Sequence, residues 1–191
     1  MRIVEKLHLN WEFVENFDEA YVKTGSLGEG AQVVNLPHAN KEVPYNYFDE
    51  KDYQFISTYK KVFTVPEDAA GKSIFIDFEG VMTYAEVWCN GAFVGSHKGG
   101  YTPFSCDVTE QVKFGEENVL IVMVDSTERD DIPPFGNVID YLCYGGIYRD
   151  VHLRIVSPVY IDNIFAKPQN VLEEEKSLST TVFLDNKAGA A

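Results

Sequence analysis

Carboxylates are the most abundant reactive side chains in this 191-residue chain, which contains 30 Asp and Glu residues. A hydrolytic acid and base pair needs two carboxyl groups held roughly 5 to 10 Å apart. With so many acids some pairs arise by chance, and none lies in an aromatic, glycine-framed motif at the end of a predicted strand. The sequence therefore predicts no catalytic residue within the chain.

Nucleophile, phosphate and metal chemistry find no better support. The chain lacks the Gly-x-Ser-x-Gly turn that presents a nucleophilic serine, and segment 95–100 lacks the lysine and Ser/Thr order of a phosphate loop. The histidines, at positions 8, 38, 97 and 152, are scattered, which argues against a metal cluster. We expect neither a metal nor another cofactor.

Binding chemistry is better placed in a long irregular segment over residues 126–144. Acids gather at its start, two prolines follow at Pro133 and Pro134, and further on the segment carries Asp140 between Ile139 and Tyr141. Prolines stiffen such a loop, and loops on a rigid scaffold commonly position binding groups. This segment is the main candidate for a binding site.

A second long segment covers residues 39–54 and carries four aromatic residues, Tyr45, Tyr47, Phe48 and Tyr53. Structureless stretches of this length are uncommon inside a compact domain and are often functional. The alternative is that these aromatic side chains cover one edge of the core. The sequence leaves both readings open.

Runs rich in Val, Ile, Phe and Tyr recur between turn residues, while helical periodicity is scarce. The sequence therefore predicts that short β-strands support these two loops. Residues 16–31 are predicted to be mostly loop, and Asn90-Gly91 predicts a tight hairpin. Strands are predicted at residues 7–13, 32–36, 57–65, 73–78, 84–89, from 92 onward, 118–125 and 147–155.

Many short strands at close spacing predict an all-β sandwich. A jelly roll is favoured over an immunoglobulin-like fold, because the strand number is too high for the latter and the loops of about 15 to 19 residues are long for it. Trp88, beside the predicted hairpin, is expected in the core, as are Tyr59 and Phe63.

Pro158 marks a predicted domain boundary, which gives a first domain over residues 1–157 and a second over 158–191. The second part contains two predicted strands, at 159–166 and 178–184, and two strands alone are only marginally stable. We therefore expect residues 158–191 to be the truncated start of a further β-sandwich domain.

Charge and cysteine content restrict the partners and the compartment. A formal net charge of −14 argues against nucleic acids and anionic membranes, both of which attract basic patches. The cysteines number three, none in a Cys-x-x-Cys pair, which favours reduced thiols in a cytoplasmic protein. The charged N-terminal residues and the lack of an apolar run of about 20 residues predict neither a signal peptide nor a membrane span.

An ordered series of short motifs carries a family resemblance. The motifs are Leu36–His38, Tyr59–Pro66, Phe78–Val81, Ala85–Gly91, Val94–Phe104, Asp107–Thr109, Asn118-Val119 and Tyr144–Val151, the last reading Tyr-Gly-Gly-Ile-Tyr-Arg-Asp-Val. Across residues 7–155 the series resembles the N-terminal sugar-binding domain of family 2 glycoside hydrolases, the β-galactosidase and β-glucuronidase group. Residues 132–136 and 140–151 look more like the β-galactosidases, although Cys143 departs from the family's usual Thr or Phe.

The resemblance implies a galactose-binding-like jelly roll followed by an immunoglobulin-like domain. It implies that Asp140 contacts the sugar and, more loosely, that Asn46 also faces it. Carboxylates suit this role because they accept hydrogen bonds from neighbouring hydroxyl groups. The family cleaves with retention, using two glutamates on a separate (β/α)₈ barrel, so the expected partners are a β-galactoside and a catalytic barrel of the same polypeptide, with a homo-oligomer contact left open.

Three functional readings remain open on sequence grounds. The first is the non-catalytic N-terminal domain of an enzyme that hydrolyses terminal β-galactosides, or of a β-glucuronidase. The second is a free-standing carbohydrate-binding module, with the aromatic residues of segment 39–54 as its stacking surface. The third is a purely structural interaction domain. On the first reading, this chain alone is inactive.

Overall fold

The structure, a computed structural model, describes residues 2–136 and 138–187 and is almost entirely β. The strands are β1 Arg2–Lys6, β2 Trp11–Val14, β3 Gln32–Val34, β4 Ile56–Thr64, β5 Ser73–Phe78, β6 Tyr84–Cys89, β7 Ala92–Lys98, β8 Phe104–Asp107, β9 Glu117–Asp125, β10 Val151–Val156, β11 Val159–Gln169 and β12 Ser177–Asn186. The helices are α1 Glu19–Thr24 and the short 3₁₀ turns η1 Glu50–Asp52 and η2 Glu67–Ala69.

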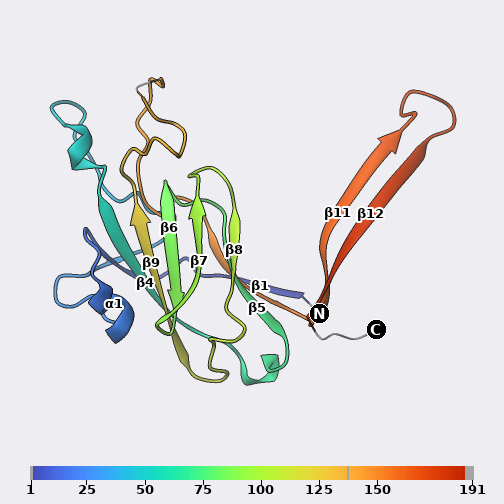
Figure 1. Cartoon of the computed structure of the whole chain (residues 1–191), viewed down its shortest axis with the longest axis horizontal. Coiled ribbons are helices and arrows are strands. Elements are labelled where there is room, and N and C mark those ends of the chain that lie inside the picture. Colours follow the sequence, from blue (N-terminus) through green and yellow to red (C-terminus); the bar gives the residue numbers. More distant parts are fainter. Residues whose placement is uncertain (1, 137, 188–191) are drawn as a thin grey trace.

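Two antiparallel sheets form a jelly-roll sandwich, which confirms the predicted fold class (Figure 1). One sheet has the order β1-β10-β5-β8 and the other the order β3-β2-β4-β9-β6-β7. Side chains alternate across each strand, so every second residue faces the partner sheet. Ile76 and Leu153 from the first sheet and Tyr59 and Val122 from the second belong to one buried cluster, which holds the two layers together.

Strand β9 lies in the interior of the larger sheet, between β4 and β6. Its residues from Leu120 to Asp125 are all buried, on both faces of the sheet. This explains the uninterrupted apolar run in the sequence. The hairpin between β6 and β7 also follows the prediction, since Asn90 and Gly91 have φ values of 51° and 83°.

Helix α1 was not predicted, because six residues are too few to show helical periodicity. Its signals are local. The Asp18 carboxylate accepts a hydrogen bond of 2.7 Å from the Ala20 amide at the N-terminus, and Gly25 ends the helix in the left-handed conformation, with φ 66°. Strands β1 and β8 were also missed by the sequence prediction.

Trp88 is not in the core, contrary to the prediction. Strand alternation points Val87 and Cys89 inward, where both are fully buried, so the indole between them lies on the outer face of the sheet and is only half-buried. There it stacks on Phe17, with ring centroids 5.6 Å apart, and meets Phe93 edge-on. Tyr59 and Phe63 are in the core, as predicted.

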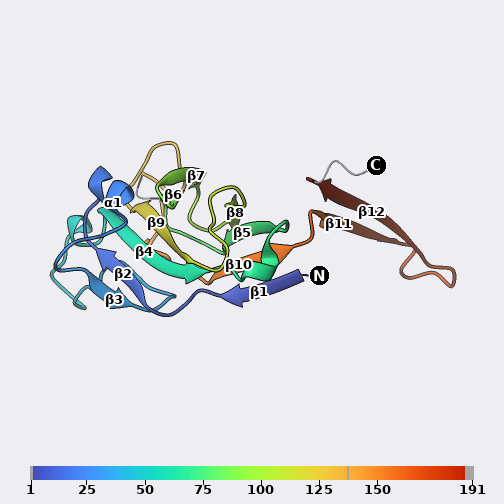
Figure 2. The same ribbon diagram turned by 90° about the horizontal axis from the view of Figure 1, so that it is seen from below.

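Strands β11 and β12 form a hairpin that extends away from the sandwich (Figure 2). Its apolar residues are largely exposed; Leu172, for example, is 98% exposed. At the base of the hairpin the Tyr160 ring packs against Phe75, with centroids 5.8 Å apart. The domain division at residue 158 stays a prediction. In the described part of the chain no helix has the length and apolar character needed to span a membrane.

Candidate functional site

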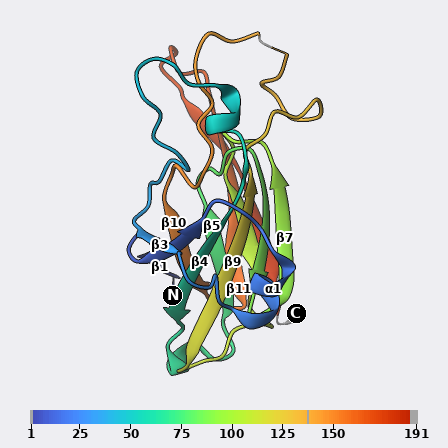
Figure 3. The ribbon, with the colours of Figure 1, turned by 90° about the vertical axis from the view of Figure 1, so that its left-hand side faces the viewer.

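The two long loops lie together at one end of the sandwich (Figures 1 and 3). The first loop, residues 35–55, connects β3 to β4, and the second, residues 126–150, connects β9 to β10. The first loop contains η1, whose start is fixed by Asp49: its carboxylate accepts from the Lys51 amide. The sheets thus bring two segments that are distant in sequence to the same place.

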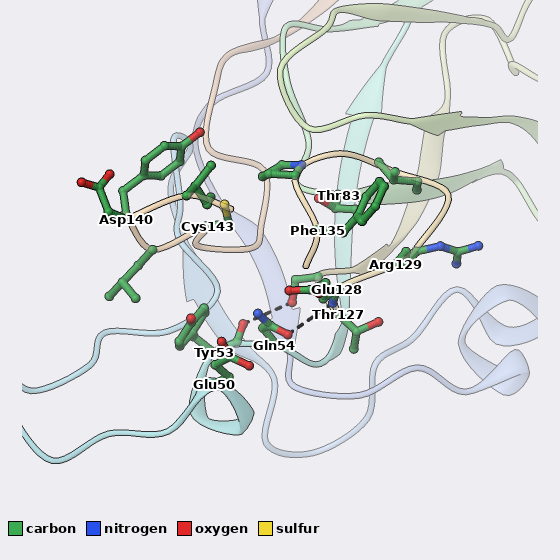
Figure 4. Close-up of a pocket in the computed structure, with 16 residues that line it drawn as sticks. Glu50, Tyr53, Gln54, Thr83, Thr127, Glu128, Arg129, Phe135, Asp140 and Cys143 are labelled. Atoms are coloured by element: carbon green, nitrogen blue, oxygen red, sulfur yellow. Dashed lines mark hydrogen bonds between the residues drawn. The ribbon is translucent and has the colours of Figure 1, made fainter. Parts of the chain in front are cut away.

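A cavity of about 190 Å³ lies between these loops, next to the start of β6 (Figure 4). Its lining residues are Glu50, Tyr53, Gln54, Thr83, Ser126, Thr127, Glu128, Arg129, Ile132, Pro134, Phe135, Ile139, Asp140, Tyr141, Leu142 and Cys143. Aromatic and aliphatic side chains are mixed with carboxylates, hydroxyls and an amide. This is the composition of a small-ligand pocket, in which apolar surface surrounds a few placed polar groups.

Asp140 lines this cavity and is exposed, at the outer edge of the loop in Figure 4. Asn46 is exposed as well, but it is not among the lining residues. Its neighbours Tyr45 and Tyr47 are fully exposed, while Tyr53 is 3% exposed and packs against Tyr144. The structure therefore brings Asp140 to the cavity and leaves Asn46 outside its wall. Tyr53 is buried, as the edge-covering reading expects, whereas a binding role for Tyr45 and Tyr47 stays a prediction.

The stems of the two loops are joined by backbone hydrogen bonds. The His38 amide donates to the Ile147 carbonyl at 2.9 Å, and the Asn40 amide donates to the Gly145 carbonyl at 2.8 Å. On its other side Gly146 exchanges two hydrogen bonds with Met82, which comes just before β6. Residues 145–147 thus lie as a short ribbon between the first loop and the sheet.

Paired glycines are required in this ribbon because other backbone and side-chain atoms approach it closely. A Cβ on Gly145 would lie 2.1 Å from the Ser126 Cβ, and one on Gly146 would lie 2.6 Å from the His38 carbonyl oxygen. Gly146 also has φ 115°, which side chains disfavour. The Gly-Gly pair in the sequence therefore marks the point where the two loops are hydrogen-bonded and packed against each other.

The only cation among the lining residues of the described cavity, Arg129, is already paired. Its Nη1 lies 3.3 Å from Asp125 and its Nε lies 3.1 Å from Asp131, which also meets Lys98 at 2.5 Å. The hydrogen bonds from Lys98 and Arg129 lower the pKa of Asp131 to about 2. These ion pairs hold the start of the second loop against β7 and leave Arg129 little free charge for a ligand.

Carboxylates dominate the remaining charge of the wall, through Glu50, Glu128 and Asp140. Glu128 accepts from the Gly136 amide at 2.8 Å, and its own amide donates to the Gln54 side chain at 3.2 Å. The second contact joins the two loops across the cavity. The wall can therefore accept hydrogen bonds from hydroxyl groups and disfavours an anionic ligand.

Beneath the ribbon, the His38 Nδ1 lies 2.8 Å from the Tyr59 hydroxyl. Burial lowers the pKa of His38, although Glu42 opposes this, and burial raises the pKa of Tyr59. Both groups are therefore held neutral near pH 7. The pair supports the first loop as a neutral hydrogen-bonded contact and does not line the cavity.

Glu79, Asp150 and His152 bring ligand-type atoms within 4.8 Å of one another, although the sequence gave no metal pattern. Lys6 already meets the Asp150 carboxylate at 2.6 Å, and His152 lies 3.7 Å from Glu79. A lysine ammonium supplies the positive charge that a cation would supply. We assign no metal to this cluster.

Several lining residues were missed by sequence reasoning, among them Glu50, Gln54, Thr83, Glu128 and Arg129. Glu128 and Arg129 lie in the acidic stretch that was singled out, so composition pointed near them. Nothing in the sequence marks Thr83, which reaches the cavity only because β6 pairs with β9.

Comparison with known proteins identifies the family of this chain. Residues 34–157 match the family model described as "Glycosyl hydrolases family 2, sugar binding domain". The chain is 49% identical to a β-galactosidase of Thermoanaerobacterium thermosulfurigenes over 187 residues, which cover 97% of this chain and 26% of the relative. It is 36% identical to a β-glucuronidase of Bacteroides fragilis over 140 residues, covering 70% of this chain and 20% of that protein.

A solved structure shows the same fold. The structure of Bacteroides uniformis β-glucuronidase 2, covalently bound to cyclophellitol-6-carboxylate aziridine, superposes with a TM-score of 0.83 at 28% identity. The match covers 94% of this chain and 22% of that one. The chain thus spans about a quarter of the length of the relatives it matches. Because the family model covers most of the jelly roll, the chain belongs to glycoside hydrolase family 2 and contains the sugar-binding domain of that family.

Proposed function

We propose that this chain is the non-catalytic N-terminal domain of a retaining glycoside hydrolase that cleaves terminal β-galactosides. The loop cavity forms one wall of the substrate pocket, and a (β/α)₈ barrel of the same polypeptide supplies the catalytic glutamates. Asp140 accepts hydrogen bonds from sugar hydroxyls, and Asn46 approaches the sugar only where the barrel completes the pocket.

The observation that carries the choice of sugar is the charge of the cavity wall. Glu50, Glu128 and Asp140 line it, and Arg129 is neutralised by two aspartates. A glucuronide brings its own carboxylate and would be repelled, whereas a galactoside is neutral. The greater similarity to a β-galactosidase than to a β-glucuronidase supports the same choice.

A cytoplasmic location belongs to this proposal. The cysteines of the described chain are free, and burial raises the pKa of Cys89 and Cys106 to about 12. Such thiols are inert and need no oxidising compartment.

The decisive test replaces Asp140 by Asn in the longer polypeptide that the proposal requires. Loss of one charged hydrogen-bond partner should lower kcat/KM for a nitrophenyl β-galactoside by roughly 10- to 100-fold. The matched control Asp162→Asn, on the exposed hairpin, should leave kcat/KM unchanged. Equal activity of the Asp140 variant and the parent, or a preference for the β-glucuronide, would sink the proposal.

A free-standing carbohydrate-binding module is the second candidate, favoured by the fully exposed Tyr45 and Tyr47. Calorimetric titration of this chain with galactose, lactose and glucuronate separates the two. The proposed domain needs its barrel, so we expect no turnover and no binding at millimolar sugar. Binding in that range that is lost in Tyr45→Ala would favour the module.

A further inference from the structure

The two loops that line the cavity are tied together by side chains as well as by backbone. Asn40 lies at the start of the first loop and is 2% exposed, and Ser126 lies at the start of the second and is 5% exposed. Their positions are 86 residues apart in sequence. The Asn40 Nδ2 donates to the Ser126 Oγ at 2.9 Å.

Each donor and acceptor in this contact has a defined role. The Asn40 Nδ2 also donates to the Tyr53 carbonyl at 3.0 Å, so both of its protons are used. Because a carbonyl can only accept, the amide nitrogen must face Tyr53, which fixes the orientation of the side chain. The Oδ1 atom is buried and has no partner in the described structure. Both side-chain hydrogen bonds of Asn40 therefore come from its NH₂ group, beside the backbone hydrogen bond to Gly145.

Ser126 completes the connection to the end of the first loop, at Phe55. Its hydroxyl donates to the Phe55 carbonyl at 2.6 Å and accepts from the Phe55 amide at 3.1 Å, in addition to accepting from Asn40. One proton and two lone pairs are thus all engaged. Gly145 packs directly over this hydroxyl-bearing carbon, which encloses the contact.

We infer that Asn40 and Ser126 are positioning residues that lock the two cavity loops into a single wall. Tyr53 and Ser126 themselves line the cavity, so the lock acts directly on the wall. Substitution of either residue should loosen both loops, because the buried hydrogen bond between Asn40 and Ser126 is shared by the two loops. The sugar ligand of this wall rests on the proposed function; the coupling of the loops does not.

Asn40→Asp is the sharpest test, because it keeps the size of the side chain and removes both donated hydrogen bonds. Hydrogen exchange of the full chain near pH 7 should show protection falling roughly tenfold or more in residues 41–54 and also in residues 127–136. Asn16→Asp is the matched control: its side chain is exposed and hydrogen-bonds Tyr21 beside α1, so the change should affect neither segment.

Protonation separates hydrogen bonding from packing. A buried carboxyl group takes up a proton more readily, and the protonated acid regains one donor toward Tyr53 or Ser126. Protection of both segments in Asn40→Asp should therefore recover near pH 5, relative to the parent at the same pH. A role in packing alone would give no such recovery.

The titratable groups around position 40 are few. His38 and Tyr59 face the ribbon from the first loop and β4, and Glu42 acts on His38. Tyr53 bonds Asn40 through its backbone carbonyl and not its hydroxyl, and Asp125 next to Ser126 is paired with Arg129. Of these, His38 lies nearest to titration between pH 7 and 5, and the parent chain measured at both pH values corrects for it.

Ser126→Ala provides a second, milder variant in case Asn40→Asp fails to fold. It should reduce protection in both segments without recovery near pH 5. The inference is overturned if either variant loosens only its own loop, if neither segment changes, or if Asn40→Asp shows no recovery. Loop coupling without any effect of Asp140→Asn would refute the proposed function and leave the lock standing.

Discussion

Gly145 is fixed by its contact with Ser126 rather than by its own backbone conformation. Its φ is not in the left-handed region, unlike that of Gly146, but a methyl group on it would overlap the Ser126 Cβ and the Asn40 amide. Ser126 cannot withdraw, because its hydroxyl is bonded on three sides. One hydrogen atom in place of a methyl group is thus what lets the loop ribbon close.

Gly145→Ala should therefore lower the free energy of unfolding by about 3 kcal/mol, in the range of buried overpacking. Urea denaturation of the full chain measures this. Gly28→Ala is the control: it has open space around it and φ 77°, so backbone strain alone should cost about 1 kcal/mol. A loss at Gly145 no larger than the loss at Gly28 would contradict the close contact.

The β11–β12 hairpin depends on the sandwich more than the sandwich depends on it. In the described chain, Val156 is the last apolar residue that is buried. The apolar residues of the hairpin are largely exposed. Phe75 makes the main contact, since Tyr160 packs on its ring and Lys187 lies 4.8 Å from its centroid. Arg154 covers the same ring while bonding Asp77 twice, at 2.6 and 3.0 Å.

A chain ending at Ser157 should accordingly fold into the same sandwich. Removing the hairpin loses one aromatic pair, one cation–ring contact and the exposed Lys187–Asp107 ion pair, so the free energy of unfolding should fall by no more than about 2 kcal/mol. Tyr160→Ala in the full chain should reproduce most of that change. If the shortened chain shows no cooperative urea transition, the predicted division at residue 158 is wrong.

At the scale of the whole molecule, charge is the dominant feature. With a net charge of −14, the excess carboxylates repel one another across the surface. The ion pairs on that surface are mostly exposed, and each contributes little to stability. The same excess of carboxylates gives the cavity its negative wall. The predicted effect on stability and the proposed preference for a neutral sugar thus share one electrostatic origin.

Added salt should therefore stabilise the chain. The free energy of unfolding in urea should rise as NaCl increases from about 10 to 300 mM, because screening shortens the reach of the repulsion from about 30 Å to less than about 10 Å. The free energy of unfolding should level off above about 300 mM NaCl. Stabilisation by exclusion of salt from the protein surface would instead keep increasing up to about 1 M. A constant or falling value would show that attractive pairs outweigh the net charge.

Local and repeated patterns in the sequence were enough for the fold class. The apolar run of β9, the Asn90-Gly91 hairpin and strands β5 and β6 could be predicted because alternation and turn residues are read from neighbouring positions. The ordered series of motifs, which ends in the Gly-Gly block, also identified the family correctly. Helix α1 and the outward face of Trp88 could not be predicted, since short elements and strand faces depend on what packs around them.

The sequence by itself determined that the chain is a β-sandwich of a sugar-processing family, with a stiff acidic loop near Asp140. Only the tertiary structure decided which residues meet at that loop. The contacts between Asn40, Ser126 and Gly145 join positions up to 105 residues apart, and Glu128 reaches Gln54 across the cavity. Irregular loops have no periodicity to reveal such pairs; the pairing of β4 with β9 sets them side by side, and burial then selects their partners.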